Sequence, residues 1–317
     1  MTVVDRADDG ATAAWRLKPT SGASLQGGTD GGAAWRDGWI DGAGVRLHTV
    51  SAGRGPAVVL LHGFPDFWYA WRHQLPALAA AGFHAVALDL RGYNLSGRPT
   101  RVEDYRIDVL ADDVAAAIRG LGVGRAHVVG HDWGGAIAWH VAARHPELVD
   151  RLVVCNAPHP ARYRELLRTR AQARRAWYVA FFQLPWLPER VLGARDLAAL
   201  RRVWRGAYRI APPLDATELE AYAAAFRAPA ARRAALAYYR ARVRHGAHVP
   251  PERRRLPHRV LLVWGAHDPA LVRANAEGLE RWVPDLRVLH LPDAGHWPMV
   301  DAPLTVNAAL VDFLRAP

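Results

Sequence analysis

Short runs of consecutive apolar residues recur along the chain and alternate with longer amphipathic segments. Such runs are typical of strands that are buried on both faces of a sheet. Those expected to be strands lie at 57–61, 84–90, 126–129, 152–155, 260–264 and 286–291, after a hairpin at 38–50. Apolar residues at helical spacing predict helices over 66–80, 106–121, 270–282 and 303–315. Because strands and helices alternate, we expect right-handed crossovers and a mostly parallel sheet, the arrangement of an α/β fold.

The alternation stops in the middle of the chain. Residues 161–257 show no buried-strand pattern, are rich in Arg, Ala, Leu and Trp, and are interrupted by several prolines. We therefore expect a helical cap over 161–257, inserted between two parts of the α/β core at 36–160 and 258–317. Residues 1–35 are rich in Gly, Ala, Ser and Thr, and this composition predicts a disordered tail.

The segment around Asp132 carries the first candidate chemistry. An apolar strand runs into Gly130-His131-Asp132-Trp133-Gly134-Gly135, and a helical pattern follows. In a Gly-x-nucleophile-x-Gly turn, the glycines permit a strained backbone that presents one side chain at the top of an α/β sheet. The simpler interpretation is an aspartate that only caps the helix.

An aspartate at the nucleophile position favours a particular reaction. A carboxylate is already ionised at neutral pH, so it can attack saturated carbon without a base and form an alkyl ester of the enzyme. A base elsewhere in the site is then free to activate water for the hydrolysis of that ester. This chemistry suits epoxides and alkyl halides.

An acid and a histidine are expected after the nucleophile, in that order. Asp268 comes soon after the strand at 260–264, where sites in open α/β sheets lie, and His296 follows the last strand. We expect Asp268 to orient His296, and His296 to be the base. His131 and His267 compete for that role, but each is the sequence neighbour of a candidate catalytic carboxylate and should point away from it.

Backbone N–H groups are the expected stabilisers of an oxyanion. Phe64 follows the first buried strand, and Trp133 follows the nucleophile at a helix N-terminus, so both N–H groups can face the site. A plain turn is the alternative at Phe64. No spacing of His, Cys and acidic residues suggests a metal site, and no glycine-rich fingerprint suggests a dinucleotide, so no cofactor is expected.

Charge and cysteine content narrow the possible partners. The chain carries a net charge of +11, and residues 161–258 hold 21 arginines against 7 acidic residues. A basic stripe is also found in proteins that bind nucleic acid or membranes, but here many arginines alternate with alanines at helix-surface spacing, which favours a solvated face. Cys155 is the only cysteine, and no apolar run approaches the ~20 residues of a membrane span. We expect a cytoplasmic protein, monomer or homodimer, without nucleic-acid or membrane partners.

The motifs together resemble the α/β-hydrolase superfamily and, within it, the cap-bearing epoxide hydrolases. The resemblance runs from about Trp39 to the C-terminus. It rests on His62-Gly63-Phe64-Pro65, Trp68-Tyr69, Trp71-Arg72, Arg91-Gly92-Tyr93, Gly130 to Gly135, Trp264-Gly265, Asp268 and Gly295-His296-Trp297. It implies an α/β-hydrolase fold with an inserted helical cap, and a cis peptide bond between Phe64 and Pro65.

The resemblance also implies two cap tyrosines that hold the epoxide oxygen. The sequences around Tyr178 and at Tyr238-Tyr239-Arg240 are similar to the family motifs, so Tyr178 and Tyr239 are the candidates, with Tyr238 as the adjacent competitor. A tyrosine hydroxyl can stabilise and protonate the alkoxide that leaves when the ring opens. The alternative is that both tyrosines only pack in an aromatic-rich cap.

The implied function is hydrolysis of a small-molecule epoxide by water to a vicinal diol, through an ester on Asp132. The alternative is a haloalkane dehalogenase-type hydrolase with the same triad. It is disfavoured because Trp133 and Ala136 replace the arginines of fluoroacetate dehalogenases, and Phe64 replaces a halide-binding asparagine, although Trp133 and Trp177 could hold a halide. A binding protein without turnover is a third alternative. The identity of the epoxide and the regio- and enantioselectivity stay open.

Overall fold

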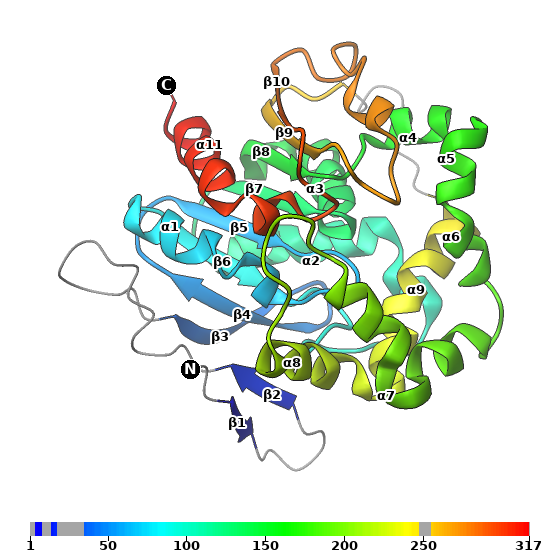
Figure 1. Cartoon of the computed structure of the whole chain (residues 1–317). Helices are drawn as coiled ribbons and strands as arrows, with labels where there is room; N and C mark the ends of the chain where they lie inside the picture. Colours follow the sequence, from blue (N-terminus) through cyan, green and yellow to red (C-terminus); the bar gives the residue numbers. More distant parts are fainter. Residues whose placement is uncertain (1–3, 8–13, 18–34, 247–254, 317) are drawn as a thin grey trace.

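The centre of the molecule is an eight-stranded, mostly parallel sheet. The computed structural model describes residues 4–7, 14–17, 35–246 and 255–316 (Figure 1). The strand order is β10-β9-β8-β7-β5-β6-β4-β3. The run from β6 through β10 is parallel, whereas β4 pairs antiparallel with β3 and β6 at one edge. The expected α/β fold is confirmed.

The strands form where the apolar runs predict them. Every residue of β5 and β7 is buried, because helices cover both faces of the sheet there. The strands are β3 (Arg36–Asp41), β4 (Arg46–Ala52), β5 (Ala57–Leu61), β6 (His84–Leu88), β7 (Ala126–His131), β8 (Val149–Cys155), β9 (Arg259–Gly265) and β10 (Leu286–Leu291).

Helices flank the sheet in two pairs. α1 contacts α11 and α2 contacts α3, so each pair forms one layer of the sandwich (Figure 1). On α2 the buried residues include Leu110, Val114 and Ile118, the positions whose helical spacing predicted it. The bounds are α1 (Gln74–Ala80), α2 (Ile107–Gly120), α3 (Trp133–Arg144), α10 (Pro298–Asp301) and α11 (Pro303–Arg315), with 3₁₀ turns at Trp68–Trp71, Val102–Tyr105 and Pro146–Leu148.

Between β8 and β9 the chain leaves the sheet and forms a helical insertion, defined here as residues 160–246. Its helices are α4 (Pro160–Leu166), α5 (Arg170–Arg175), α6 (Trp177–Phe181), α7 (Leu187–Arg205), α8 (Ala216–Arg227) and α9 (Pro229–His245). No strand lies in this described stretch. Two buried hydrogen bonds join it to loops at the sheet: Trp204 Nε1 donates to the Pro65 carbonyl at 2.8 Å, and the Tyr238 hydroxyl donates to the Arg91 carbonyl at 2.6 Å.

The structure differs from expectation after β9. The helix expected over 270–282 is wrong: only the 3₁₀ turn Arg273–Ala276 forms, and further turns follow. Glu277 is already extended and Gly278 has a φ of +67°, so helical geometry does not continue beyond Ala276. Leu279 and Val283 lie in irregular chain and are fully buried. Their helix-like spacing therefore results from burial and not from a helix. The helix expected over 66–80 is likewise split into a 3₁₀ turn and α1.

The expected N-terminal tail and the expected cap lie partly outside the described residues. Within the tail expected to be disordered, Val4–Ala7 and Ala14–Leu17 are described as a pair of antiparallel strands, β1 and β2. The rest of that tail, and 247–254 of the expected cap, lie outside the described residues. Over the part of the chain that is described, no helix is both long and apolar enough to cross a membrane.

Candidate active site

Asp132 stands on a strained elbow between β7 and α3. Its backbone has φ +50° and ψ −117°, an unfavourable conformation for a residue with a Cβ. A Cβ on Gly134 would lie 2.1 Å from the Leu61 carbonyl oxygen, and one on Gly130 would lie 2.4 Å from that of Gly134. Only glycine fits at both positions. The Asp132 side chain makes no capping hydrogen bond to α3, which argues against the helix-cap interpretation.

The loop after β5 holds one oxygen of the Asp132 carboxylate. The Phe64 N–H donates to Asp132 Oδ1 at 2.9 Å. Gly63 permits this approach, because a Cβ there would lie 2.4 Å from the Asp132 Cβ. The peptide bond between Phe64 and Pro65 is cis, as the resemblance implies. Trp133 is the first residue of α3, but among the described residues its N–H makes no hydrogen bond to Asp132, so its oxyanion role stays a prediction.

The structure brings Asp268 and His296 to the same end of the sheet. His296 Nδ1 donates to Asp268 Oδ2 at 2.6 Å, and His296 Nε2 lies 3.6 Å from Asp132 Oδ2. The histidine therefore lies between the two carboxylates, within ion-pair distance of both. Asp132 Oδ1 accepts the Phe64 N–H, whereas Oδ2 faces His296 and is the candidate oxygen for attack.

Asp268 is fixed by hydrogen bonds that the sequence interpretation missed. Asn156, at the end of β8, donates from Nδ2 to Asp268 Oδ2 at 2.7 Å and accepts from the Gly265 N–H at 2.7 Å. The N–H groups of Ala270 and Leu271 donate to Asp268 Oδ1. A polar residue directly after a buried strand was the available signal for Asn156. These bonds hold the carboxylate in one orientation toward the histidine.

Burial and neighbouring charges set the protonation states of the triad. Burial alone would lower the pKa of His296, but Asp268 and Asp132 outweigh it and raise the pKa to about 10. Burial alone would raise the pKa of each carboxyl, but His296 outweighs it and both values fall below the ordinary range. At neutral pH the site thus holds two carboxylates around one imidazolium.

The competing histidines do not reach the carboxylates. Burial lowers the pKa of His131 to about 3, so its ring is neutral, and its Nε2–H donates to the His296 carbonyl at 2.8 Å. His131 therefore supports the loop that carries His296, the candidate base. His267 is exposed.

Asp301 is a second residue that sequence reasoning missed. Its Oδ2 accepts from the Gly295 N–H at 2.7 Å, directly before His296. Its Oδ1 accepts from the N–H groups of Arg209 and Ile210, at 2.7 and 2.9 Å. One buried carboxylate thus ties the histidine loop to the helical insertion.

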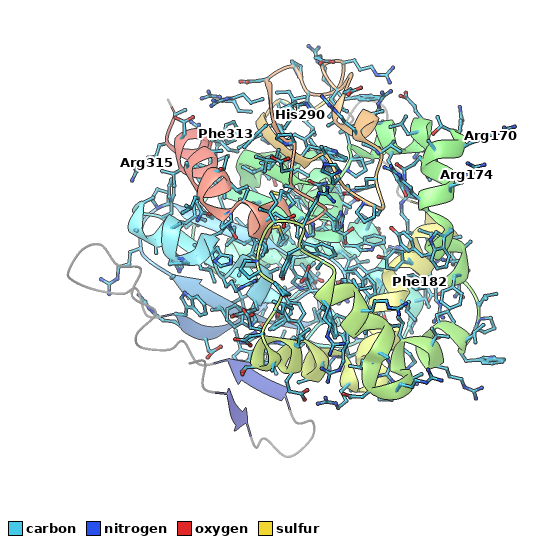
Figure 2. The ribbon with its side chains drawn as sticks, viewed as in Figure 1. Arg170, Arg174, Phe182, His290, Phe313 and Arg315 are labelled. Atoms are coloured by element: carbon cyan, nitrogen blue, oxygen red, sulfur yellow. The ribbon has the colours of Figure 1, made fainter. Side chains whose placement is uncertain are left out.

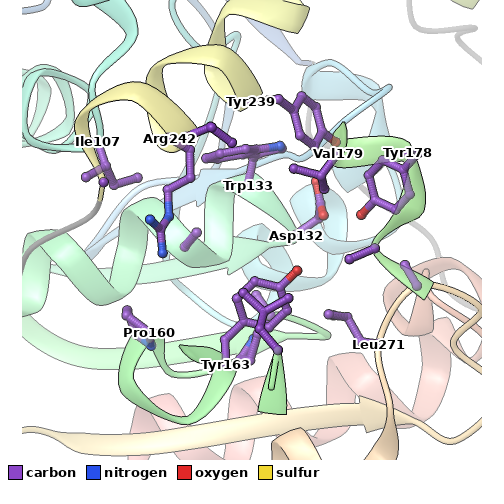
Figure 3. A pocket seen from close by; sticks show the side chains of 18 of the residues that line it. Ile107, Asp132, Trp133, Pro160, Tyr163, Tyr178, Val179, Tyr239, Arg242 and Leu271 are labelled. Carbon is purple, nitrogen blue, oxygen red and sulfur yellow. The ribbon is translucent and has the colours of Figure 1, made fainter. Parts of the chain in front are cut away.

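A cavity of about 660 Å³ opens between the sheet and the helical insertion (Figure 3). Asp132, Trp133, Tyr178 and Tyr239 all line it. In Figure 3 the Tyr178 ring lies beside Asp132 with its hydroxyl turned toward the carboxylate. Burial and the charge of Asp132 hold the pKa of both tyrosines well above the ordinary value, so both hydroxyls stay protonated and can donate.

The neighbouring Tyr238 has a different position. Its hydroxyl donates to the Arg91 carbonyl and its side chain is fully buried. It does not line the cavity, whereas Tyr239 does. The geometry therefore favours Tyr239 of the adjacent pair. Across the described residues, no group of three or more His, Cys, Asp or Glu could hold a metal ion.

Known proteins share this architecture. The family model described as the alpha/beta hydrolase fold matches residues 56–303. The AB hydrolase superfamily protein YfhM of Bacillus subtilis is 37% identical over 285 residues, covering 87% of this chain and 97% of that protein. Epoxide hydrolase 3 of Xenopus tropicalis is 37% identical over 281 residues, covering 86% and 76% of the two chains.

A solved structure agrees in fold and sequence. The Bacillus megaterium epoxide hydrolase in complex with an inhibitor has a TM-score of 0.77 and 35% identity, covering 88% of this chain and all of that one. The family match spans most of the chain, and the two alignments cover well over two thirds of each relative's own length. The chain therefore belongs to the α/β-hydrolase superfamily and, within it, to the epoxide hydrolases.

Proposed function

We propose that the protein hydrolyses a small-molecule epoxide to a vicinal diol through a covalent ester on Asp132. The observation that carries the proposal is a single cavity lined by the elbow carboxylate and by two protonated tyrosine hydroxyls. A nucleophile with proton donors around one small space can attack a carbon and neutralise the oxygen that leaves it. The helical insertion acts as a cap that supplies both donors.

In the first step Asp132 Oδ2 attacks a ring carbon, and the carbon–oxygen bond of the epoxide breaks. The tyrosine hydroxyls of residues 178 and 239 donate to the oxygen as negative charge develops on it, and one of them transfers its proton. Phe64 supports this geometry, because its N–H fixes Oδ1 and leaves Oδ2 facing the cavity. The product is an alkyl ester with a free hydroxyl on the neighbouring carbon.

In the second step His296 activates water, which adds to the carbonyl carbon of the ester. Asp132 is among the groups that raise the pKa of His296, so esterification removes one anion and lowers that pKa. The imidazolium can then give its proton, through the cavity, to the tyrosinate that the first step left, which restores the tyrosine and leaves His296, still oriented by Asp268, as a neutral base. The Phe64 N–H stabilises the oxyanion on Oδ1, and the diol leaves with Oδ2.

The experiment is a single turnover in heavy-oxygen water. Water adds at the Asp132 carbonyl, so the label should enter Asp132 and the first diol should carry none. In His296→Gln the ester should accumulate and add one substrate mass to the peptide that contains Asp132. Asp132→Ala should give neither adduct nor turnover. Label in the first diol, with no trapped adduct, would mean that water attacks the epoxide directly.

The dehalogenase alternative has less support. Trp177, one of the two tryptophans that could hold a halide, is 67% exposed and does not line the cavity. Tyr178 and Tyr239 line the cavity. Position 64 is a phenylalanine and cannot bind a halide as the asparagine of many dehalogenases does. We therefore do not propose this second activity.

A further inference from the structure

One arginine of the helical insertion faces the catalytic cavity. Arg242 lies on α9 and lines the same cavity as Asp132 (Figure 3). Most arginines of this region behave as a solvated face; Arg170 and Arg174 of α5, for example, project outward from the fold (Figure 2). Arg242 is only partly exposed, so solvation of a helix surface does not account for its position at the cavity.

Arg242 has no anionic partner among the described residues. Arg240, two residues earlier on α9, shows the contrast: it pairs with Glu189 at 2.6 Å and donates to two backbone carbonyls. Burial lowers the pKa of Arg242, and the nearby Arg164 lowers it further. A partly buried cation without an anion is unfavourable for folding alone, so the guanidinium is available for a ligand that supplies the negative charge.

The guanidinium and the nucleophile share one continuous space. In Figure 3 Arg242 lies on the opposite side of the view from Tyr178, with Trp133 between them. Tyr163 lies close enough to both Arg242 and Asp132 to be affected by their charges. Burial raises the pKa of Tyr163 most, while Arg242 lowers it and Asp132 raises it. The wall near Arg242 includes the apolar residues Ile107, Ala136 and Pro160, together with His140, whose pKa burial lowers to about 4, so that its ring is neutral. A ligand with an apolar chain and one anionic end can therefore reach both groups.

We propose that Arg242 binds the carboxylate of the substrate, so that the protein prefers epoxides that carry a carboxylate at the end of an apolar chain. The inference rests on the proposed function and adds a specificity-determining residue to it. The guanidinium presents two parallel N–H groups that match a carboxylate, and the surrounding apolar wall strengthens the charge-assisted bonds. Tyr178 and Tyr239 hold the epoxide oxygen at the other end, so the carboxylate fixes which way round the substrate lies.

The test compares terminal epoxy acids of increasing chain length with their methyl esters, which are neutral and similar in shape. For the acid of best length, kcat/KM of the unaltered enzyme should exceed that for its ester. Arg242→Met should lower kcat/KM for the acid by between about tenfold and about a hundredfold and leave the ester nearly unchanged. Arg242→Lys should keep part of the preference. The matched control is Arg244→Met, an exposed arginine on the same helix with the same change in net charge.

Three results would overturn the inference: equal kcat/KM for acid and ester, equal loss on both substrates in Arg242→Met, or the same selective loss in Arg244→Met. The last would mean that net charge attracts the acid from solution. Calorimetric binding of the product diol acid and diol ester separates this inference from the proposed function. If no epoxide is turned over but Arg242→Met alone weakens binding of the diol acid, the activity proposal fails and the carboxylate site stands.

Discussion

Replacing Tyr239 by phenylalanine isolates the contribution of one hydroxyl to ring opening. The Tyr239 ring packs against Phe64, Trp133 and Phe182, with ring centroids 5.6, 5.0 and 4.9 Å away. The Tyr239 hydroxyl also interacts with the Trp133 side chain, but the ring-to-ring contacts do not depend on it, so the ring should keep its place in Tyr239→Phe. The substitution therefore removes a donor from the cavity wall without opening a hole in the packing.

The expected cost is large for the reaction and small for stability. A preorganised donor to a developing oxyanion is typically worth ~3 kcal/mol, so epoxide opening should slow about a hundredfold. Tyr178 remains as the second donor and keeps the residual rate above zero. Losing both hydroxyls should nearly abolish opening.

The adjacent tyrosine is the matched control. The Tyr238 hydroxyl donates to the buried Arg91 carbonyl, away from the cavity. Tyr238→Phe leaves that carbonyl without this donor and should lower the free energy of unfolding by about 1–3 kcal/mol. Its hydroxyl does not contact the substrate, and removing a group that makes no contact in the transition state leaves the rate unchanged. The rate of ring opening should therefore stay within about twofold of that of the unaltered enzyme.

The rate of opening can be measured apart from hydrolysis. In the His296→Gln background the ester should accumulate, so quenched-flow sampling and mass spectrometry of the Asp132 peptide follow the first step alone. Urea unfolding gives the stability of each variant. The reasoning is refuted if Tyr239→Phe forms the ester at the unaltered rate, or if Tyr238→Phe slows it as much as Tyr239→Phe does.

Three further expectations concern the histidine loop. Asp301→Ala removes the acceptor for N–H groups on both the helical insertion and Gly295, so amide exchange at 209–211 should speed up and kcat should fall; unchanged exchange would contradict the assigned role. Ester hydrolysis needs neutral His296 and should be lost as pH falls, with a midpoint below the pKa of about 10 of the free enzyme. An equal midpoint in ester and free enzyme would refute the role of the Asp132 charge. The stabilisation from the raised pKa is full below the ordinary 6.5 and should disappear from unfolding curves as pH rises through about 10.

The elbow could be predicted from sequence because its glycines are local requirements. Gly130 and Gly134 are dictated by backbone atoms within one turn or on the neighbouring strand, and any fold with this geometry needs them. The buried strands were predictable for a similar reason, since continuous apolar runs have few alternatives to a two-faced sheet. Asp268 and His296 followed from the position of their loops after β9 and β10.

Other parts of the site depend on contacts between distant segments. Asn156 acts by joining the ends of β8 and β9, and Asp301 acts by reaching residues about 90 positions earlier. Neither contact leaves a periodic or local pattern in the sequence. The helix predicted at 270–282 was wrong for a related reason. Tertiary packing buries Leu279 and Val283, and this burial requires apolar residues without fixing the conformation of the backbone between them.

The electrostatics of the triad also explain why the two proposed steps occur in order. While Asp132 is ionised, it and Asp268 keep His296 protonated, so the free enzyme holds no strong base beside the cavity. A protonated histidine does not hinder the first step, because the nucleophile is a carboxylate with a pKa already below its ordinary range. Ester formation neutralises Asp132 and removes part of the force that holds the proton on His296. In the proposed mechanism, formation of the ester bond therefore both creates the substrate of the second step and frees His296 to act as a base, so Asp132 sets the order of the two steps.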